Sequence, residues 1–166
     1  MIIAPGKTLL LVTGIFYIVI GGMAILSSAV NIAIANYWNT TMPLPTGMSW
    51  SVYYAVTLLG ALFTLFVGIM GAANNKRLEK ASTLKVLGII AICYVVLSSI
   101  FASFMLFILT SFLSDIFGHF SNFLYAFIGI VAIFSLGIGL ILPILYTIGA
   151  QRNLKAYRAM QAHHFQ

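Results

Sequence analysis

The residues best placed to do acid–base or metal chemistry in this chain are Asp115 and His119. A carboxylate and an imidazole four positions apart can meet on one face of a helix, where they could share a proton, bind an ion or contact a partner protein. A bound metal would need at least one more strong ligand, and the segments expected beside this pair supply no Cys, Glu or second His. We therefore interpret the two side chains as a hydrogen-bonded surface pair. A partner contact and a catalytic or ion-binding site stay open as alternatives.

The other reactive side chains are placed less favourably for chemistry. Glu79 lies among basic residues and predicts only a solvated charge group, and the single cysteine, Cys93, cannot form a disulfide within the chain. Adjacent histidines such as His163 and His164 point about 100° apart on a helix and chelate poorly. The sequence contains no Gly-rich phosphate loop of Walker type, paired-cysteine motif or nucleophile elbow. We expect no catalytic site, no cofactor and no bound metal, and the chain is predicted not to be an enzyme.

The composition points to a membrane protein. Of the 166 residues, 62% are apolar and 6% are charged, which is far from the usage of soluble proteins. A soluble fold of this size would leave much of its apolar surface in water, whereas a lipid environment removes that difficulty. The net charge of +6 would also suit nucleic acid. Because membrane topology explains the same charge, we expect no nucleic-acid partner.

Four apolar stretches are long enough to cross a membrane, at residues 8–35, 51–73, 86–113 and 122–149. About 20 residues suffice for a span, and helix is the form that satisfies every backbone polar group within one segment. The alternation of a membrane barrel is absent. The predicted fold is an all-α membrane protein with four transmembrane helices in an up-down bundle. This bundle forms one domain over residues 1–150, followed by a basic cytoplasmic tail over residues 151–166.

The basic residues predict how the chain is oriented. Lys and Arg occur before the first stretch, between the second and third, and after the fourth, whereas the connections 36–50 and 114–121 contain none. Basic residues collect in cytoplasmic loops, so both termini are expected in the cytoplasm and the protein in the plasma membrane. Basic side chains beside a membrane attract anionic lipid headgroups, each contributing about 1 kcal/mol. The residues expected to do so are Lys76, Arg77, Lys80, Lys85, Arg152, Lys155 and Arg158.

Small residues recur at helical spacing and predict close packing between helices. The expected packing residues are Gly60, Thr64, Gly68, Ala72, Ser99, Ser103, Ser135 and Gly139. We expect these stripes to join the four helices, with binding of another membrane protein as the alternative. Bulky substitution should then harm Gly68 more than a neighbour that faces lipid, such as Leu65.

Short matches between the two halves suggest an internal repeat. The pattern Gly-Ala-x-x-Asn occurs at residues 71–75 and again at 149–153, and the approach to Gly14 is similar to the approach to Gly88. Two hairpins of the same orientation would form a parallel repeat. Because common membrane residues make up these matches, a chance origin stays open beside a duplication.

Three segments together resemble a known group of proteins. They are GLILPILYTIGA at 139–150, GIMG at 68–71 and KVLGII at 85–90. The chain resembles small uncharacterised four-helix membrane proteins of Gram-positive bacteria. The resemblance implies a bacterial plasma membrane. It brings no active-site residues with it.

The sequence favours a non-enzymatic membrane module that packs against a partner membrane protein or against itself. A small oligomeric transporter or channel component is the first alternative, and its pathway would have to form between copies because four helices enclose no wide pore. The second alternative is a membrane protein that binds a lipid or another apolar ligand. In each case the lipid bilayer, with anionic headgroups on the cytoplasmic side, is a partner of the chain.

Overall fold

The described part of the protein is built from helices. The computed structural model describes residues 4–41, 49–117 and 121–164, and these residues contain no strand. The elements are α1 (Lys7–Ala33), α2 (Ala35–Thr41), α3 (Trp50–Asn74), the 3-10 helix η1 (Leu78–Lys80), α4 (Ala81–Phe117) and α5 (Ser121–His164). Helices α1, α3, α4 and α5 are each long and apolar enough to cross a membrane. This confirms the predicted helical class and the expected number of candidate spans.

Two helices extend beyond the limits expected from the sequence. Helix α4 begins at Ala81, inside the expected connection, and α5 continues through residues 151–164, the expected tail. Good helix formers explain the second extension, because Ala, Gln, Leu, Lys, Arg and Met make up most of these residues and no Gly or Pro follows Gly149. The short helix α2 begins at Ala35, the last residue of the first expected stretch, and continues into the expected connection 36–50.

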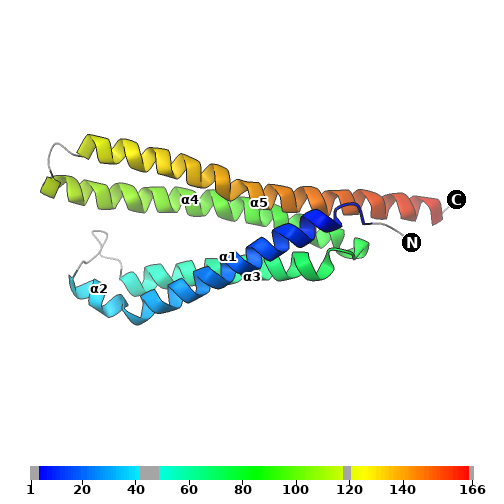
Figure 1. Cartoon of the computed structure of the whole chain (residues 1–166), viewed down its shortest axis with the longest axis horizontal. Coiled ribbons are helices and arrows are strands. Elements are labelled where there is room, and N and C mark those ends of the chain that lie inside the picture. The colour runs from blue at the N-terminus through cyan, green and yellow to red at the C-terminus, as the bar shows by residue number, and fades with distance from the viewer. Residues whose placement is uncertain (1–3, 42–48, 118–120, 165–166) are drawn as a thin grey trace.

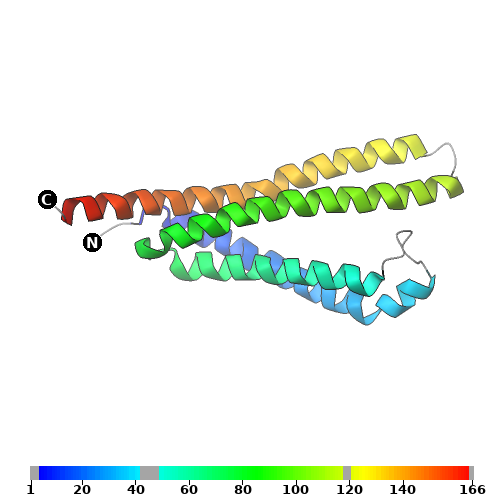
Figure 2. The same cartoon turned by 180° about the vertical axis from the view of Figure 1, so that it is seen from behind.

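The four long helices form two hairpins. Helix α1 packs along α3, and α4 packs along α5 (Figure 1). The two chain termini lie at one end of the molecule together with η1, and α2 lies at the opposite end. The hairpins touch near the termini, mainly through α1 and α5, and they separate toward α2 (Figure 2). We call the end with the termini the closed end and the end with α2 the open end.

The buried core lies toward the closed end, whereas much of the outer surface is apolar. The core cluster consists of Leu10, Tyr17, Val67, Leu84, Tyr146 and Ala150. Elsewhere large apolar side chains point outward: Leu26 is 69% exposed and Ile133 is 73% exposed. Such a surface is unfavourable in water and suits a lipid environment.

Glycines bring α1 and α3 into backbone contact. A Cβ atom on Gly14 would lie 2.9 Å from the carbonyl oxygen of Gly68, and one on Gly68 would lie 2.8 Å from the carbonyl oxygen of Gly14. Small residues permit this approach, which is the main packing device in lipid. Farther along α1, a Cβ on Gly21 would lie 2.9 Å from the Cα of Leu65. Leu65 is therefore half-buried against α1, and it does not face lipid as expected.

The second hairpin has a comparable contact. A Cβ atom on Gly88 of α4 would lie 3.1 Å from a ring carbon of Tyr146 and 3.2 Å from the Cα of Thr147, both on α5. Gly14 and Gly88, which the suggested repeat pairs with each other, each lie at a close contact between the two helices of a hairpin. Glycine thus has the same role in both hairpins.

A buried asparagine ties the closed end together. Asn153 of α5 is fully buried, and its Oδ1 accepts a hydrogen bond from the backbone N–H of Gly6 at 2.7 Å. Its Nδ2 donates to the carbonyl oxygen of Asn75 at 3.1 Å. These backbone groups lie at the start of α1 and the end of α3, where helices leave donors and acceptors without intrahelical partners. The two asparagines of the repeated pattern are therefore in direct contact.

Candidate functional site: a cleft between the two hairpins

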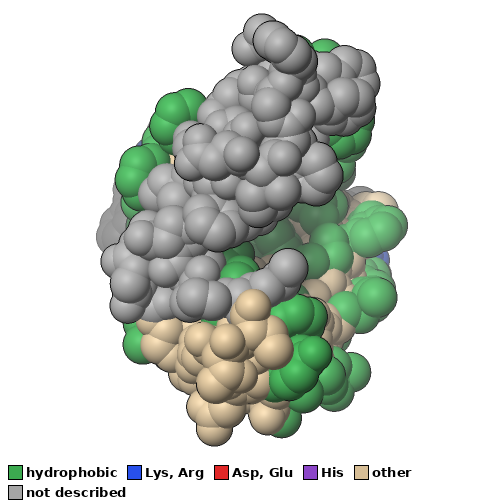
Figure 3. Space-filling view, turned by 90° about the vertical axis from the view of Figure 1, so that its left-hand side faces the viewer, with side chains coloured by type: hydrophobic (Ala, Val, Ile, Leu, Met, Phe, Trp, Pro, Cys, Tyr) green, Lys and Arg blue, Asp and Glu red, His purple; other side chains and the backbone are tan. Residues whose placement is uncertain are grey.

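A cavity lies between the hairpins, and we call it the cleft. It has a volume of about 510 Å³ and is lined by residues of α1, α3, α4 and α5. Along α1 its lining runs from Tyr17 to Asn31, which at 1.5 Å per residue is roughly 20 Å. Seen from the open end, the surface is hollowed between the hairpins, with apolar side chains inside the hollow (Figure 3). The cleft is therefore elongated along the helix axes.

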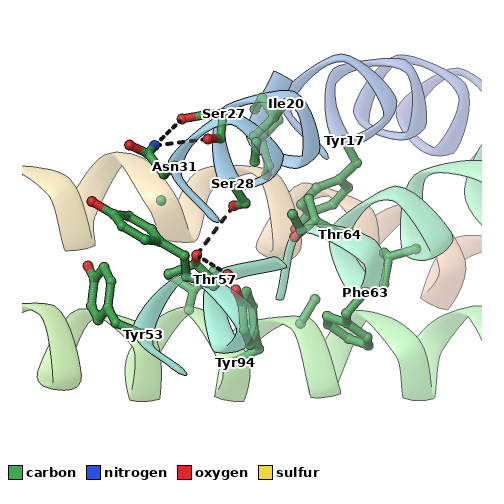
Figure 4. A pocket seen from close by; sticks show the side chains of 18 residues that line it. Tyr17, Ile20, Ser27, Ser28, Asn31, Tyr53, Thr57, Phe63, Thr64 and Tyr94 are labelled. Carbon is green, nitrogen blue, oxygen red and sulfur yellow. Dashed lines mark hydrogen bonds between the residues drawn. The ribbon is translucent and has the colours of Figure 1, made fainter. Parts of the chain in front are cut away.

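Hydrogen-bonding side chains gather at the end of the cleft nearest α2. Ser27, Ser28 and Asn31 come from the last turns of α1, and Tyr53 and Thr57 come from the first turns of α3 (Figure 4). The hydroxyl oxygens of Ser28 and Thr57 lie 3.3 Å apart. Asn31 Nδ2 donates to the carbonyl oxygen of Ser27 at 2.9 Å. We call these five residues the polar end of the cleft.

The part of the cleft nearer the closed end is mainly apolar. Ile20, Phe63, Val67 and Leu142 line it, and Figure 4 shows Phe63 away from Ser27, Asn31 and Tyr53. The hydroxyl of Thr64 also faces this region, but it donates to the carbonyl oxygen of Gly60 in its own helix at 2.9 Å. None of the described lining residues is Asp, Glu, Lys, Arg or His. The described lining of the cleft is thus polar at one end, mainly apolar at the other, and uncharged.

Two buried tyrosines meet between the cleft and the core. The rings of Tyr17 on α1 and Tyr146 on α5 are edge-to-face, with centroids 6.1 Å apart. Tyr17 lines the cleft and is 6% exposed, whereas Tyr146 is fully buried. Neither hydroxyl has a hydrogen-bond partner among the described residues. Buried polar groups usually have partners, so these two hydroxyls carry a desolvation penalty unless a small molecule or water completes them.

A second cavity adjoins the cleft on the side of α4. Its volume is about 500 Å³, and it shares Tyr53, Thr57 and Tyr94 with the cleft. Ser99 and Ser103, expected to pack helices together, line this cavity instead, and Ser103 donates to the carbonyl oxygen of Ser99 at 2.8 Å. Because the two hairpins separate, α3 has few contacts with α4, and Ser99 and Ser103 therefore face a cavity.

The expected packing residues of α3 face different neighbours. Gly60 lies against a tyrosine of α4, whereas Gly68 and Ala72 lie against α1. Thr64, between them in the chain, lines the cleft. Four residues advance a helix by about 40° beyond one full turn, so positions 60 and 72 are about 120° apart around the axis. Because of that rotation, the small residues of α3 contact both α1 and α4 and also line part of the cleft.

The remaining expected residues are placed as follows. Gly139 of α5 is half-buried, lines the cleft and lies beside Val95 of α4. The side chain of Ser135 lies outside the described part of the structure. The same holds for the pair of Asp115 and His119, although the backbone of Asp115 belongs to α4. Among the side chains that are described, no group of three His, Cys, Asp or Glu residues could hold a metal ion.

The basic residues expected to contact anionic lipid lie toward the closed end. They belong to the connection between α3 and α4, the first turns of α4 and the last turns of α5 (Figure 1). Lys85 is half-buried, and the others are exposed: Lys76, Arg77, Lys80, Arg152, Lys155 and Arg158. Their side chains are therefore free to reach a surface beyond the apolar spans.

The polar end was not anticipated from the sequence, although a signal was present. Ser27, Ser28 and Asn31 lie in a span that is otherwise apolar, where polar side chains are unfavourable unless they face protein or a ligand. Their spacing predicts a shared face of α1. Their proximity to Thr57 depends on how α1 crosses α3, and residue spacing within one helix does not specify a crossing.

The chain matches no model of a known protein family, no curated protein and no solved structure. Its class therefore rests on the geometry. The structure defines a helical protein with four candidate membrane spans, arranged as two hairpins around a cleft that is polar at one end and apolar at the other.

Proposed function

We propose that this protein is a non-enzymatic integral membrane protein that binds a lipid or another apolar molecule in the cleft. The cleft itself carries the proposal. Its volume of about 510 Å³ and its apolar lining with a few polar groups are typical of small-molecule sites. Binding of a lipid or another apolar ligand, the second alternative from the sequence, is therefore the function that we favour.

In this proposal the four long helices cross a plasma membrane in alternating directions, with both termini in the cytoplasm. The distribution of charge supports this orientation. The connection between α3 and α4 and the end of α5 carry exposed basic side chains, whereas α2 and the start of α3 carry none. Cytoplasmic loops are enriched in such residues, and each one near an anionic surface adds about 1 kcal/mol of attraction. The cleft would then open toward the outer leaflet.

The test is to fill the cleft and measure what the protein retains. Ala24 lines the cleft, and Ala29 lies five positions along the same helix with an exposed side chain. The unmodified protein and the Ala24→Phe and Ala29→Phe variants would be extracted gently and analysed by native mass spectrometry. We expect a retained lipid on the unmodified protein and on Ala29→Phe, and its loss from Ala24→Phe.

A second pair of variants repeats the test from α5. Gly139 lines the cleft, whereas Gly137 has no atom within 4 Å of an added Cβ. Gly139→Leu should therefore release the lipid, and Gly137→Leu should retain it. If all of these variants remain folded and carry the same lipid as the unmodified protein, the cleft is not its binding site and the proposed function is wrong.

A second candidate function is the packing module favoured by the sequence. The observation that supports it is a set of glycines with open space around them: an added Cβ on Gly22, Gly129 or Gly137 would meet no atom within 4 Å. Glycines allow another helix to approach closely in lipid. Crosslinking of single cysteines placed next to Gly129 and Gly137 would test for such a neighbour. A partner or a second copy should then be captured at these positions.

A further inference from the structure

The ligand class of the cleft can be derived from its polarity, its free hydrogen-bonding groups and its shape. This step rests on the proposed function and adds to it the chemistry and direction of the ligand. Polarity changes along the helix axes: Ser28 and Thr57 lie at one end, and Phe63 lies toward the other (Figure 4). Val67, one turn beyond Phe63 on α3, also lines the cleft. A molecule that matches this change must have a polar group at one end and an apolar part that extends toward the core.

The polar end has hydrogen-bonding capacity left over. The hydroxyl of Thr57 donates to the carbonyl oxygen of Tyr54 at 2.9 Å, so the proton between Thr57 and Ser28 comes from Ser28. Asn31 uses its Nδ2 on Ser27 and leaves its Oδ1 without a partner among the described residues. The Tyr53 hydroxyl has no hydrogen bond within that part of the chain either. The Asn31 Oδ1 acceptor, the hydroxyl protons of Tyr53 and Ser27, and acceptor lone pairs on Ser28 and Thr57 therefore remain for a ligand that both donates and accepts.

The headgroup must also be uncharged. The described lining of the cleft contains no acidic, basic or histidine side chain. An ionised carboxylate or ammonium group placed at Ser28 and Thr57 loses part of its water and gains no opposite charge, which is unfavourable. Hydroxyl, ester and amide groups lose far less and can bind Asn31 Oδ1 and the Tyr53 hydroxyl.

We infer that the cleft binds an uncharged amphiphile with a linear alkyl chain. Its headgroup, with hydroxyl and ester or amide groups, lies between α1 and α3 at Ser28, Asn31 and Thr57. Its chain runs toward Phe63 and Val67, along a lining that extends roughly 20 Å on α1. The neutral lipids with one acyl chain, such as monoacylglycerols, have this chemistry.

The experiment compares three photoreactive probes that share one alkyl chain. The probes are a monoacylglycerol, a fatty acid held at alkaline pH so that it is ionised, and an alkyl trimethylammonium. Each is added to the full-length protein in nanodiscs of phosphatidylcholine, and saturable crosslinking is measured in competition with its unlabelled form. We expect the monoacylglycerol to bind at least about tenfold more tightly than either charged probe, a difference of about 1.4 kcal/mol. A photoreactive group at the chain end should label Phe63 or Val67.

Variants of the polar end locate the headgroup. The double variant Ser28→Ala with Thr57→Val should weaken monoacylglycerol binding about tenfold, and Tyr53→Phe, which removes one hydroxyl, should weaken it about threefold. Ser82→Ala, an exposed serine at the closed end, is the matched control and should change nothing. Should the double variant fail to fold, Tyr53→Phe carries the test, because the loss of one hydroxyl preserves the ring and its packing.

The outcomes separate this inference from the proposed function. If a charged probe binds as tightly as the monoacylglycerol, the inferred headgroup is wrong while the cleft remains a ligand site. If the monoacylglycerol binds but neither polar-end variant weakens it, the inferred direction of the ligand is wrong. If no probe crosslinks saturably and Ala24→Phe changes nothing, the proposed function itself is wrong.

Discussion

Asn153 and Gly6 are joined by a buried hydrogen bond that connects the last long helix to the residue before the first. Asn153 Oδ1 accepts from the backbone N–H of Gly6 at 2.7 Å, and the same side chain donates to the carbonyl oxygen of Asn75. One amide thus fastens α1, α3 and α5 at the closed end. Because the hairpins are held there and have few contacts near α2, they separate and leave the cleft between them.

Replacing Asn153 should loosen the closed end. In Asn153→Leu, the N–H of Gly6 and the carbonyl oxygen of Asn75 both lose their partner, and a buried group left unsatisfied costs about 1–3 kcal/mol. We expect a clear fall in the thermal midpoint in detergent. Gln151→Leu, two positions away and exposed, is the control and should change the midpoint little. Equal midpoints for the two variants would mean that Asn153 does not fasten the hairpins.

Bulky residues at the contact of α1 with α3 should be strongly destabilising. Gly68→Ile would force a side chain into the backbone of α1 at Gly14 and Ile18, and crowding of a tight contact costs about 1–3 kcal/mol or more. Gly22→Ile is the matched control, since an added Cβ there meets no atom within 4 Å. Thermal unfolding in detergent should separate the two variants. A loss as large for Gly22→Ile as for Gly68→Ile would contradict the backbone contact.

The hydroxyl of Tyr146 should contribute nothing to stability. It is buried without a described partner, so Tyr146→Phe removes a desolvation penalty and should leave the free energy of unfolding unchanged or raise it by up to about 1 kcal/mol. Tyr146→Ala removes the ring from the core and should lower it by about 3–5 kcal/mol. A marked loss in Tyr146→Phe would instead reveal a bound molecule or water on the hydroxyl.

The open and closed ends should lie on opposite sides of the membrane. Thr41 at the end of α2 and Lys80 in η1 are both exposed. In a background with Cys93→Ala, single cysteines at these two positions would be treated with an impermeant thiol reagent on intact cells. We expect labelling at position 41 and protection at position 80 until the cells are opened. The reverse pattern would invert the proposed orientation.

The number of candidate spans could be predicted from the sequence because the requirements of a membrane span are local in the chain. A segment that crosses the membrane must be apolar over about 20 residues and helical throughout, and both properties can be read in one stretch. The apolar stretch expected at 51–73, for example, lies within α3 (Trp50–Asn74). The sequence gives a weaker signal for the extension of α5 through residues 151–164. Polar residues replace the apolar pattern there, and only the high helix propensity of these residues indicates that the helix continues.

The sequence by itself determined a helical chain with four candidate membrane spans, since composition and length act along the chain without reference to neighbours. Only the tertiary structure decided what those helices enclose. Gly60 and Gly68 look alike in the sequence, yet one faces α4 and the other faces α1, because each step of four residues turns the helix by about 40°. Likewise, Ser28 and Thr57 meet only because glycines let α1 and α3 pack closely, while the Asn153 contact holds the hairpins together at one end. The cleft is a product of those crossings, and the crossings depend on contacts between residues far apart in the chain.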